Sequence, residues 1–318
     1  MSSIGILFAF ITTLCWATSV FPLTKASKLM PVRSMNVLRL FLASIIVCLG
    51  SLLLEGNQFY NLFSEKYYQA WIWLGLSGII AMSFGDHLSF RMYSILSPKF
   101  GSVLSTLSPA SALILGIILV NEEMNLVGII GILITIISVM SISLGKKERN
   151  TIPLTGQGSI KKGIFYGVLA ACCHGSGLAF AKKGFNLQNE IHQTILPISA
   201  AFIRVSCGTI AVIFLAFLNG RLFQIVPIIF KQKNGSFKYI LFGTVLGPVI
   251  AASTSLISIQ HIRVAVAQTI FSLVPIFALI IAHFIYKEKI SLRAIVGVLI
   301  SIVGVFILIW RDTITAWF

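Results

Sequence analysis

The stretch LSPASALILGIILVNEEMNLVGIIGILITI, residues 107–136, occurs in this chain in two related copies. The second copy is LVPIFALIIAHFIYKEKISLRAIVGVLISI, residues 273–302, displaced from the first by 166 positions. Each copy consists of an apolar run with a proline, a short turn with a glutamate, and a second apolar run. The residues that coincide include Pro109 with Pro275, Glu122 with Glu288, Leu126 with Leu292, and Gly131 with Gly297. Two such copies in a hydrophobic chain predict a membrane protein built from two related halves.

The composition is that of a membrane protein. Of the 318 residues, 57% are hydrophobic and 10% are charged, whereas about a quarter of the residues of a soluble protein are charged. Apolar runs of roughly 18 to 25 residues are long enough to cross a bilayer. The Lys and Arg behind the net charge of +15 lie mostly between these runs, where basic residues set orientation and meet anionic lipid. The sequence contains no soluble basic domain, which argues against a nucleic-acid partner.

Ten transmembrane helices are predicted, so the expected fold class is an all-α membrane protein. Most connections are very short, which makes neighbouring helices antiparallel hairpins. The longer connections are 218–237 and a polar, basic linker at 146–162, which is interrupted by Pro153 and two glycines. This linker separates a first five-helix repeat, 1–145, from a second, 163–318. The expected spans are 3–23, 35–54, 70–92, 97–120, 126–145, 163–183, 196–217, 238–260, 264–286 and 291–310.

An odd number of spans in each half has a geometric consequence. The second half must enter the membrane from the side opposite to the first, which gives inverted-topology repeats. Such repeats provide two related gates around a site near the midplane of the membrane. Alternating access requires this arrangement.

Asp86 is the only acidic residue well inside a predicted span, and His87 follows it. An ionisable side chain at that depth costs about 2.5–3.5 kcal/mol or more, so it normally faces the bundle interior or a wet cavity. Asp86 could be a substrate or proton site with His87 as its neighbour. It could also form a structural ion pair with Arg39 or Arg91. The corresponding positions of the second half hold no ionisable residue, which favours the functional interpretation.

Two pairs of equivalent positions are further candidates. His174 stands in the sixth span where Trp16 stands in the first, and it could bind substrate or a backbone carbonyl. Arg39 and Arg204 each lie early in the second span of their half. They could face a cavity, where they would favour anionic or zwitterionic substrates, or they could extend to the lipid headgroups.

Pro109 and Pro275 each remove a backbone hydrogen bond, which predicts a kink in the fourth and ninth spans. Small or polar residues surround them: Ser105, Ser108, Gln268 and Ser272. Kinked helices with free carbonyl groups suit a binding site at the midplane, although a kink could also serve packing alone. Small-residue faces around Gly131 and Gly304 predict close helix packing, within the chain or across a homodimer contact.

Three features together resemble a known family. Trp16, the stretch NVLRLFLAS at 36–44, and the copies at 107–136 and 273–302 are similar to those of the EamA-type drug/metabolite transporters. The resemblance covers nearly the whole chain and implies ten helices around a central substrate cavity. It implies that the fourth and ninth spans line the cavity, that the fifth and tenth pack behind them, and that small organic solutes cross the bacterial inner membrane. It also implies cytoplasmic termini, whereas the count of Lys and Arg in the loops favours termini outside the cell.

The sequence favours a secondary transporter, an exporter or exchanger of a small organic metabolite that works by alternating access. The chain has no G-x-x-x-x-G-K-[ST] motif for ATP. Proton-coupled multidrug efflux is an alternative, in which Asp86 would replace the carboxylate that the first span lacks. A membrane-embedded enzyme or a non-transporting scaffold is a more distant alternative.

The expected partners are a small-molecule substrate and the lipid bilayer, with a homodimer as a further option. All five cysteines lie in apolar runs without a CxxC pattern, which indicates neither a metal site nor a disulfide framework. No cofactor is expected.

Overall fold

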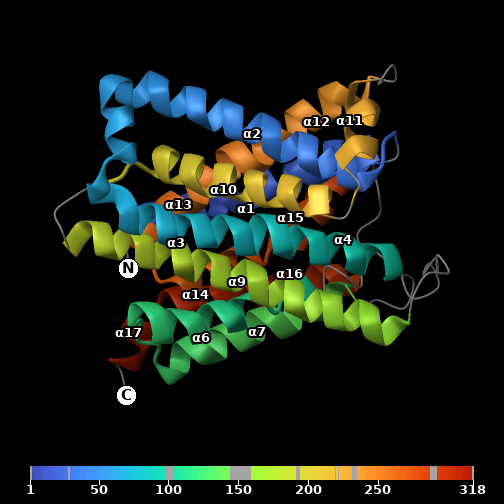
Figure 1. The fold of residues 1–318 in the computed structure, drawn as a ribbon. Helices are drawn as coiled ribbons and strands as arrows, with labels where there is room; N and C mark the ends of the chain where they lie inside the picture. The colour runs from blue at the N-terminus through green and yellow to red at the C-terminus, as the bar shows by residue number, and fades with distance from the viewer. Residues whose placement is uncertain are drawn as a thin grey trace.

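The computed structural model is entirely helical over the residues that it describes, with no strand among them (Figure 1). Every predicted span is occupied there by one helix or by consecutive helices. Glu288 and positions 146–158 of the predicted linker lie outside the described part of the chain. The described residues are 2–27, 29–96, 104–143, 159–190, 194–218, 220, 222–230, 235–286 and 292–316.

The first half contains two helices that end at a residue with positive φ. The second helix ends at Gly56 (φ 55°), where a glycine removes the steric cost of that conformation, and the fourth-span helix ends at Asn121 (φ 52°). The elements of this half are α1 (Ser3–Ser27), α2 (Val32–Glu55), the 3₁₀ helices η1 (Gly56–Phe63) and η2 (Glu65–Tyr67), α3 (Tyr68–Gly78), the π-helix η3 (Ile79–Gly85), α4 (Asp86–Ile95), α6 (Ser108–Val120) and α7 (Leu126–Ser143).

The second half departs from the sequence prediction in two places. The sixth-span helix is longer than the expected 163–183, because its last turns bury Phe185 and Gln188. The expected connection at 218–237 contains a short helix, α11, which packs against α2 and buries Ile225. The elements are α9 (Ile160–Glu190), α10 (Pro197–Leu218), α11 (Leu222–Phe230), α12 (Ser236–Thr244), the π-helix η4 (Val245–Ala251), α13 (Ala252–His261), α14 (Val264–Phe271), α15 (Val274–Tyr286), α16 (Leu292–Ile309) and α17 (Arg311–Thr315).

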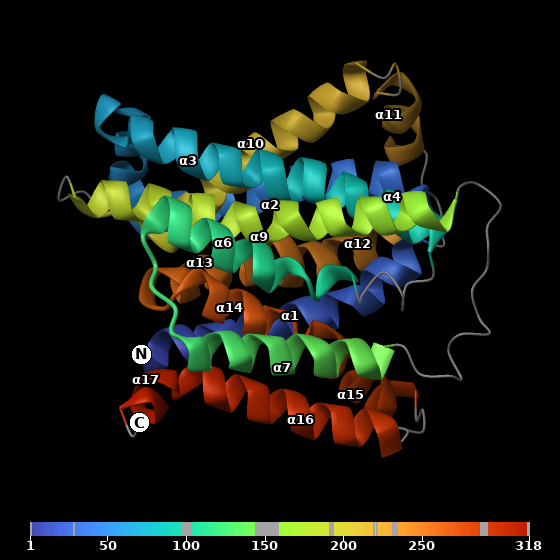
Figure 2. The ribbon, with the colours of Figure 1, turned by 90° about the horizontal axis from the view of Figure 1, so that it is seen from below.

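The two chain termini lie at the same end of the bundle (Figures 1 and 2). We call this the terminal end and the opposite one the far end. Helix α1 runs from the terminal end to the far end, whereas α9, its counterpart in the second half, runs towards the terminal end (Figure 2). The same reversal relates α7 to α16. Helices of the second half therefore run opposite to their counterparts.

The repeat extends to the irregular parts of the backbone. The π-helices Ile79–Gly85 and Val245–Ala251 are both seven residues long, and they are 166 positions apart. Helix breaks recur at the same displacement, in turns at 106–107 and 272–273. These turns lie just before Pro109 and Pro275, where the sequence predicts kinks. π-Helical stretches are rare in proteins, and those that occur are often at functional sites. Their repetition therefore indicates a functional site in the middle of the bundle.

Six helices or runs of helices in the described chain are long and apolar enough to cross a membrane. Each includes at least 18 residues with few charges. These are Ser3–Ser27, Arg33–Phe63, Ile160–Glu190, Pro197–Leu218, Ser236–His261 and Val264–Ile281. Shorter apolar helices are Ser108–Val120, Leu126–Ser141 and Ile295–Ile309.

The small-residue faces of α7 and α16 pack against each other (Figure 2). A side chain at Gly131 would place its Cβ 2.8 Å from the carbonyl oxygen of Gly304. The hydroxyl of Ser138 donates a hydrogen bond to the carbonyl of Gly297 on the facing helix. These faces are therefore occupied within one chain, which corrects the option that they serve a homodimer contact.

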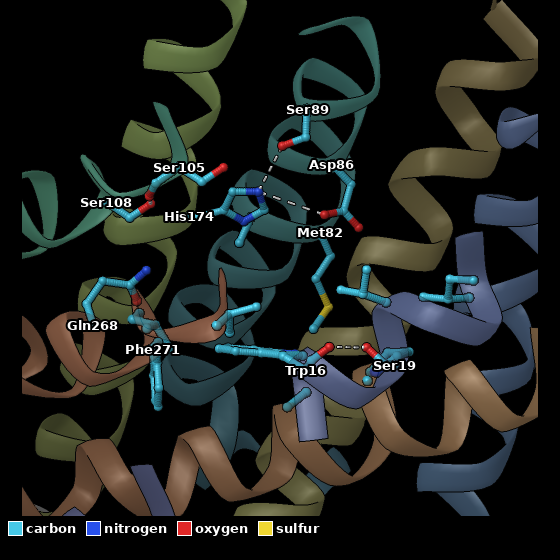
Figure 3. A pocket seen from close by; sticks show the side chains of 18 of the residues that line it. Trp16, Ser19, Met82, Asp86, Ser89, Ser105, Ser108, His174, Gln268 and Phe271 are labelled. Atoms are coloured by element: carbon cyan, nitrogen blue, oxygen red, sulfur yellow. Dashed lines mark hydrogen bonds and ion pairs between the residues drawn. The ribbon is translucent and has the colours of Figure 1, made fainter. Parts of the chain in front are cut away.

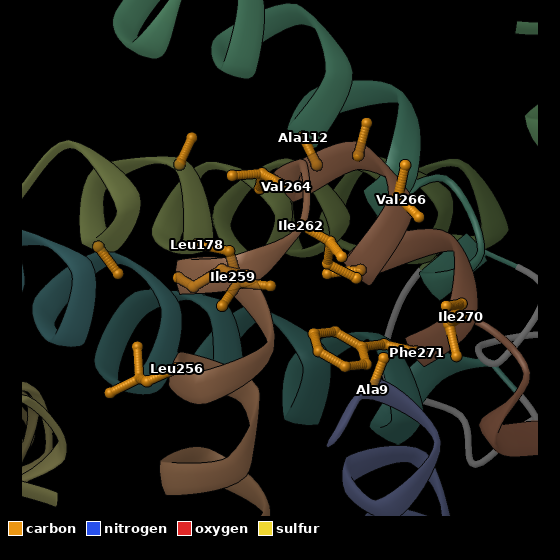
Figure 4. Packing of buried hydrophobic residues seen from close by; sticks show 14 of the residues in the cluster. Ala9, Ala112, Leu178, Leu256, Ile259, Ile262, Val264, Val266, Ile270 and Phe271 are labelled. Atoms are coloured by element: carbon orange, nitrogen blue, oxygen red, sulfur yellow. The ribbon is translucent and has the colours of Figure 1, made fainter. Parts of the chain in front are cut away.

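A hydrophobic core cluster surrounds α13 and α14 (Figure 4). Every residue of α14 is buried. The hydroxyl of Ser258 donates to the carbonyl of Gly5 at 2.9 Å, and a Cβ on Gly5 would lie 2.6 Å from the Ile262 side chain. This contact between α1 and the α13–α14 connection leaves no space for a solute.

The contact between α7 and α16 predicts that Gly131→Ala destabilises the protein. The new Cβ would lie 2.8 Å from two rigid backbone atoms, Gly304 O and Leu308 N, and such overpacking costs about 1–3 kcal/mol. Gly50→Ala is the matched control, because its Cβ would also approach to 2.8 Å, but to the flexible tip of Ile198. Thermal unfolding of the detergent-purified variants measures both. Equal midpoints for the two variants would contradict the prediction.

Candidate substrate cavity

A cavity of about 400 Å³ lies between the two halves of the bundle (Figure 3). The part of α1 that lines it, from Trp16 to Leu23, is the half nearer to the far end, and the fourth span contributes Ser105, Thr106 and Ser108, at or just before the start of α6, which is the end of α6 away from the termini. The cavity therefore occupies the middle of the bundle and extends towards the far end, away from the packed core at the terminal end.

Most of the residues singled out from the sequence line this cavity. The exceptions are His87 and Pro109, which are not among its lining residues. His87 follows Asp86 on α4, and consecutive helical residues do not share a face, so only one of the two can face the cavity. The predicted residues that line it are Trp16, Arg39, Asp86, Ser105, Ser108, His174, Arg204, Gln268, Ser272 and Pro275.

The helices around the cavity are arranged as the family resemblance implies. The fourth and ninth spans line it, the latter through Gln268, Phe271 and Ser272. None of the described residues of α7 and α16 lines it. The fifth and tenth spans thus pack behind the cavity and present exposed apolar side chains such as Ile137 and Phe306 to the surroundings.

Asp86 is the centre of a polar network on one wall. Its carboxylate forms an ion pair with the Arg39 guanidinium, which also donates to the side-chain oxygen of Asn36 at 2.8 Å. His174 Nε2 lies 3.9 Å from Asp86 Oδ1 and 3.3 Å from the hydroxyl of Ser89 (Figure 3). Of the two partners that the sequence allows for Asp86, the structure pairs it with Arg39.

The backbone next to Asp86 explains how His174 reaches it. Asp86 is the first residue after the π-helix η3, and its N–H donates to the carbonyls of Ala81 and Ser83. Gly85 faces α9, where a Cβ would lie 3.1 Å from the His174 ring and 3.2 Å from Cys173. A larger residue at position 85 would push α9 away and separate His174 from the carboxylate.

Arg204 reaches the same cavity from α10 and is only 5% exposed. Gly78, just before η3, allows this position, because a Cβ there would overlap the carbonyl oxygen of Arg204. Among the described residues, the Nε of Arg204 has no hydrogen-bond partner. The side chain does not extend to the lipid headgroups, which was the other interpretation of its position.

The opposite wall is aromatic. Trp16 and Phe271 pack edge to face, with ring centroids 5.1 Å apart and an interplanar angle of 83°. Gln268 lies beside them and is 8% exposed, and its side-chain oxygen has no hydrogen-bond partner among the described residues (Figure 3).

Several lining residues were not predicted from the sequence. Ser89 could have been found, since it lies three residues after Asp86 and thus on the same helix face. Met82 and Phe90 carry no such signal, because apolar residues in a span are too common to be distinctive. Pro248 lines the cavity from η4, and its place in a π-helix cannot be read from a proline alone.

A second polar cluster lies at the terminal end, between the two halves. Both carboxylate oxygens of Glu122 accept a hydrogen bond from the Val264 N–H at 2.9 Å. Glu122 thus caps the N-terminus of α14, a helix of the second half that is distant from it in the chain. A carboxylate at a helix N-terminus is stabilised by the helix dipole.

Lys182 makes the complementary contact with the end of α13. Its ammonium group donates to the carbonyls of Ile259, Gln260 and Ile262, which terminate that helix. A cation at a helix C-terminus satisfies carbonyls that lack helical partners. Glu122 and Lys182 therefore hold the α13–α14 connection from both sides. Among the described residues, no cluster of His, Cys, Asp and Glu could hold a metal ion.

The sequence model of one family, the EamA-like transporter family, matches residues 3–144 and 161–310. The chain belongs to the EamA-like transporter family. The two matched segments are the two repeats read from the sequence. As an EamA-like transporter, the chain is an integral, multi-pass membrane protein that transports small solutes.

The fold of this EamA-like transporter also occurs in a protein of known crystal structure. The two chains superpose with a TM-score of 0.71, over 98% of this chain and 99% of the other, at 13% sequence identity. At that identity the likeness shows a shared fold alone. No curated protein sequence matches the chain.

The environment of Glu122 affects how the stability of this transporter depends on pH. Burial raises the pKa of the Glu122 carboxyl above its ordinary value of 4.5, and the hydrogen bond from Val264 and the charge of Lys182 offset part of this rise. Because the unfolded chain releases its proton at lower pH than the folded protein, the free energy of unfolding falls as pH rises from the ordinary pKa to the raised one.

We expect Glu122→Ala to lower the free energy of unfolding by about 1–3 kcal/mol, because the Val264 N–H loses its acceptor at a buried helix end. Glu122→Gln keeps an acceptor without a charge, so it should retain most of the stability and remove the decline between pH 4.5 and the raised pKa. Thermal unfolding across this pH range measures both effects. Glu123→Ala is the control, since that side chain is exposed. Similar losses in the two alanine variants would contradict the role of Glu122.

Proposed function

We propose that the chain is a secondary transporter, an exporter or exchanger of a small organic metabolite in the bacterial inner membrane. Ten membrane-spanning helices form two inverted five-helix repeats, 1–145 and 163–318, joined by the linker 146–162. The substrate binds in the cavity between the repeats and crosses by alternating access.

One observation carries this proposal. The cavity lies between the two π-helices, and polar side chains of both halves reach it: Asp86 from the first, His174, Arg204 and Gln268 from the second. Ionisable groups at that depth are costly, so their presence indicates a functional site. Inverted-repeat transporters bind their substrates near the midplane, at the interface between repeats.

The two ends of the cavity differ, which supports alternating access. At the terminal end, α14 is completely buried, and Glu122 and Lys182 hold its connection to α13. The cavity extends towards the far end. We infer that the solute enters from the far end in this conformation and leaves when the terminal end opens. Opening there requires that Glu122 release the N-terminus of α14.

The charges on the cavity wall bear on the alternative functions. Two guanidinium groups, of Arg39 and Arg204, face one carboxylate, Asp86. This excess of positive charge disfavours a cationic drug, so proton-coupled multidrug efflux gains no support from these side chains. The described residues that line the cavity include no paired carboxylates and no HExxH pair for enzymatic chemistry.

Flux across proteoliposomes tests transport and the role of Asp86. With a panel of labelled metabolites, we expect protein-dependent flux of at least one member, and a loss of at least tenfold in Asp86→Asn. The physical reason is that this variant leaves two buried guanidinium groups without a counter-charge. Glu65→Gln is the matched control, because that carboxylate is exposed in η2 and lies outside the cavity. Wild-type flux in Asp86→Asn would remove this residue from the site.

An imposed pH gradient in the same assay tests coupling. Flux that accelerates with the gradient in the wild type, and no longer does so in Asp86→Asn, would assign proton transfer to this carboxylate. Flux that ignores the gradient in both would make the protein a facilitator or exchanger, with Asp86 as the counter-charge of Arg39.

Access to the cavity is expected from one face of the membrane. In a cysteine-free background, Ser105→Cys should react with a membrane-impermeant maleimide from the face opposite to the termini, because Ser105 lines the far-end part of the cavity. Ser255→Cys on α13 is the control and should stay unlabelled, since its side chain is fully buried. A tag at the N-terminus identifies the face that holds the termini. Labelling of Ser105→Cys only from the side of the termini would overturn the assigned direction.

A further inference from the structure

The cavity contains a buried cation that is not paired with any carboxylate among the described residues. Arg39 is paired with Asp86, the only carboxylate among the described residues that line the cavity. Arg204 is 95% buried, whereas most arginines in proteins are exposed. It forms no salt bridge with any described carboxylate. Its interaction with Asp86 is a Coulombic attraction at a distance, without a direct contact.

Such an arrangement is costly in an empty site. A buried charge without a hydrogen-bonded partner is among the most unfavourable features of a protein interior. The fold nevertheless holds Arg204 in this position. At Gly78, α10 approaches α3 so closely that no side chain fits between them. Since the scaffold holds a guanidinium against a solute cavity, we look for its counter-charge in the solute.

The other residues that line the cavity indicate the chemistry of the rest of that solute. The edge-to-face pair Trp16–Phe271 forms one wall, and Met82 and Phe90 add further apolar surface. The side-chain oxygen of Gln268, which has no partner among the described residues, can accept a hydrogen bond. A volume of about 400 Å³ is at the small end of the range of about 300–1,000 Å³ for organic ligands.

We propose that the transported solute is an organic monoanion, a carboxylate on an apolar or aromatic body, and that the Arg204 guanidinium holds the carboxylate. This inference rests on the proposed transport function and names the substrate class of the same cavity. A guanidinium presents a planar fork of N–H donors that matches a carboxylate in two-point contact. The apolar body then lies against Trp16 and Phe271.

Charge balance favours an organic monoanion over phosphomonoesters, zwitterions, and neutral or cationic solutes. One unneutralised guanidinium matches one negative charge, whereas a phosphomonoester brings about two. A zwitterion would need a carboxylate for its ammonium group, and Asp86 is already engaged by Arg39 and lies beside His174. A neutral or cationic solute would leave Arg204 without a counter-charge.

A set of matched compounds tests the class by binding to the purified, full-length wild type. The set is 3-phenylpropionate, its amide, phenylalanine, 3-phenylpropylamine and 2-phenylethyl phosphate. We expect the acid to bind at least tenfold more tightly than each of the others in calorimetry, because only the acid has a net charge of −1. Tighter binding of the amide or amine would overturn the proposal. Tighter binding of phenylalanine or of the phosphate would replace the monocarboxylate by a zwitterion or a phosphate.

Variants assign the contact to Arg204. Arg204→Gln should weaken binding of the acid at least tenfold and leave the amide unchanged, so that the preference for the acid disappears. Arg33→Gln is the matched control, since it removes the same charge from an exposed position outside the cavity. Should Arg204→Gln not fold, Arg204→Lys keeps the charge without the fork and should reduce the preference several-fold. An unchanged preference in a folded Arg204 variant would overturn the assignment.

Flux of the same compounds separates this inference from the transport function. Flux of the amide or amine without flux of the acid would refute the substrate class and leave secondary transport intact. Binding of the acid that depends on Arg204, with no flux of any compound in sealed proteoliposomes, would refute transport and leave the carboxylate site intact. Flux of the acid alone, lost in Arg204→Gln, supports both.

Discussion

The burial of charge in the middle of an apolar bundle is the constraint on which this structure depends. Few positions in a membrane protein can hold an ionised side chain, and here Asp86, Arg39 and Arg204 converge on one cavity from three helices. The Arg39–Asp86 pair neutralises two of these charges. Breaking such a pair is strongly unfavourable, because the remaining partner stays buried. The pair therefore links α2 to α4, and in the proposal above the third charge selects the solute.

Backbone irregularities make this convergence possible. The π-helix η3 follows Gly78 and ends at Gly85, and these glycines admit α10 and α9 so closely that Arg204 and His174 reach the cavity that Asp86 lines. A regular helix with larger residues would keep the neighbouring helices apart. The electrostatics of the cavity thus depend on local backbone geometry. This geometry requires particular residues at particular positions, whereas the spans require only general hydrophobicity. The second half repeats the π-helix at η4 without the carboxylate.

The sequence was sufficient for features that depend on local pattern or on the repeat. Apolar runs, prolines and the displacement of 166 predict the helices, the breaks before Pro109 and Pro275, and the polar residues that meet in the cavity. It was insufficient where the partner is distant along the chain. Glu122 caps α14, which is 142 positions away, and no local signal names that partner. His87 was predicted with Asp86 because the two are adjacent, but their side chains leave a helix in different directions.

The symmetry of the scaffold and the asymmetry of its chemistry have different causes. The alternating access that we propose requires related gates, and the helix breaks and π-helices recur in both halves. A solute has one head group, so its counter-charge is needed once. Arg39 and Arg204 occupy equivalent positions, but Asp86 has Ala252 as its counterpart after η4, and among the described residues only Arg39 of the two has a carboxylate partner. Under the proposal above, the loss of symmetry at this one position turns a pair of equivalent cations into one structural ion pair and one cation that binds the solute.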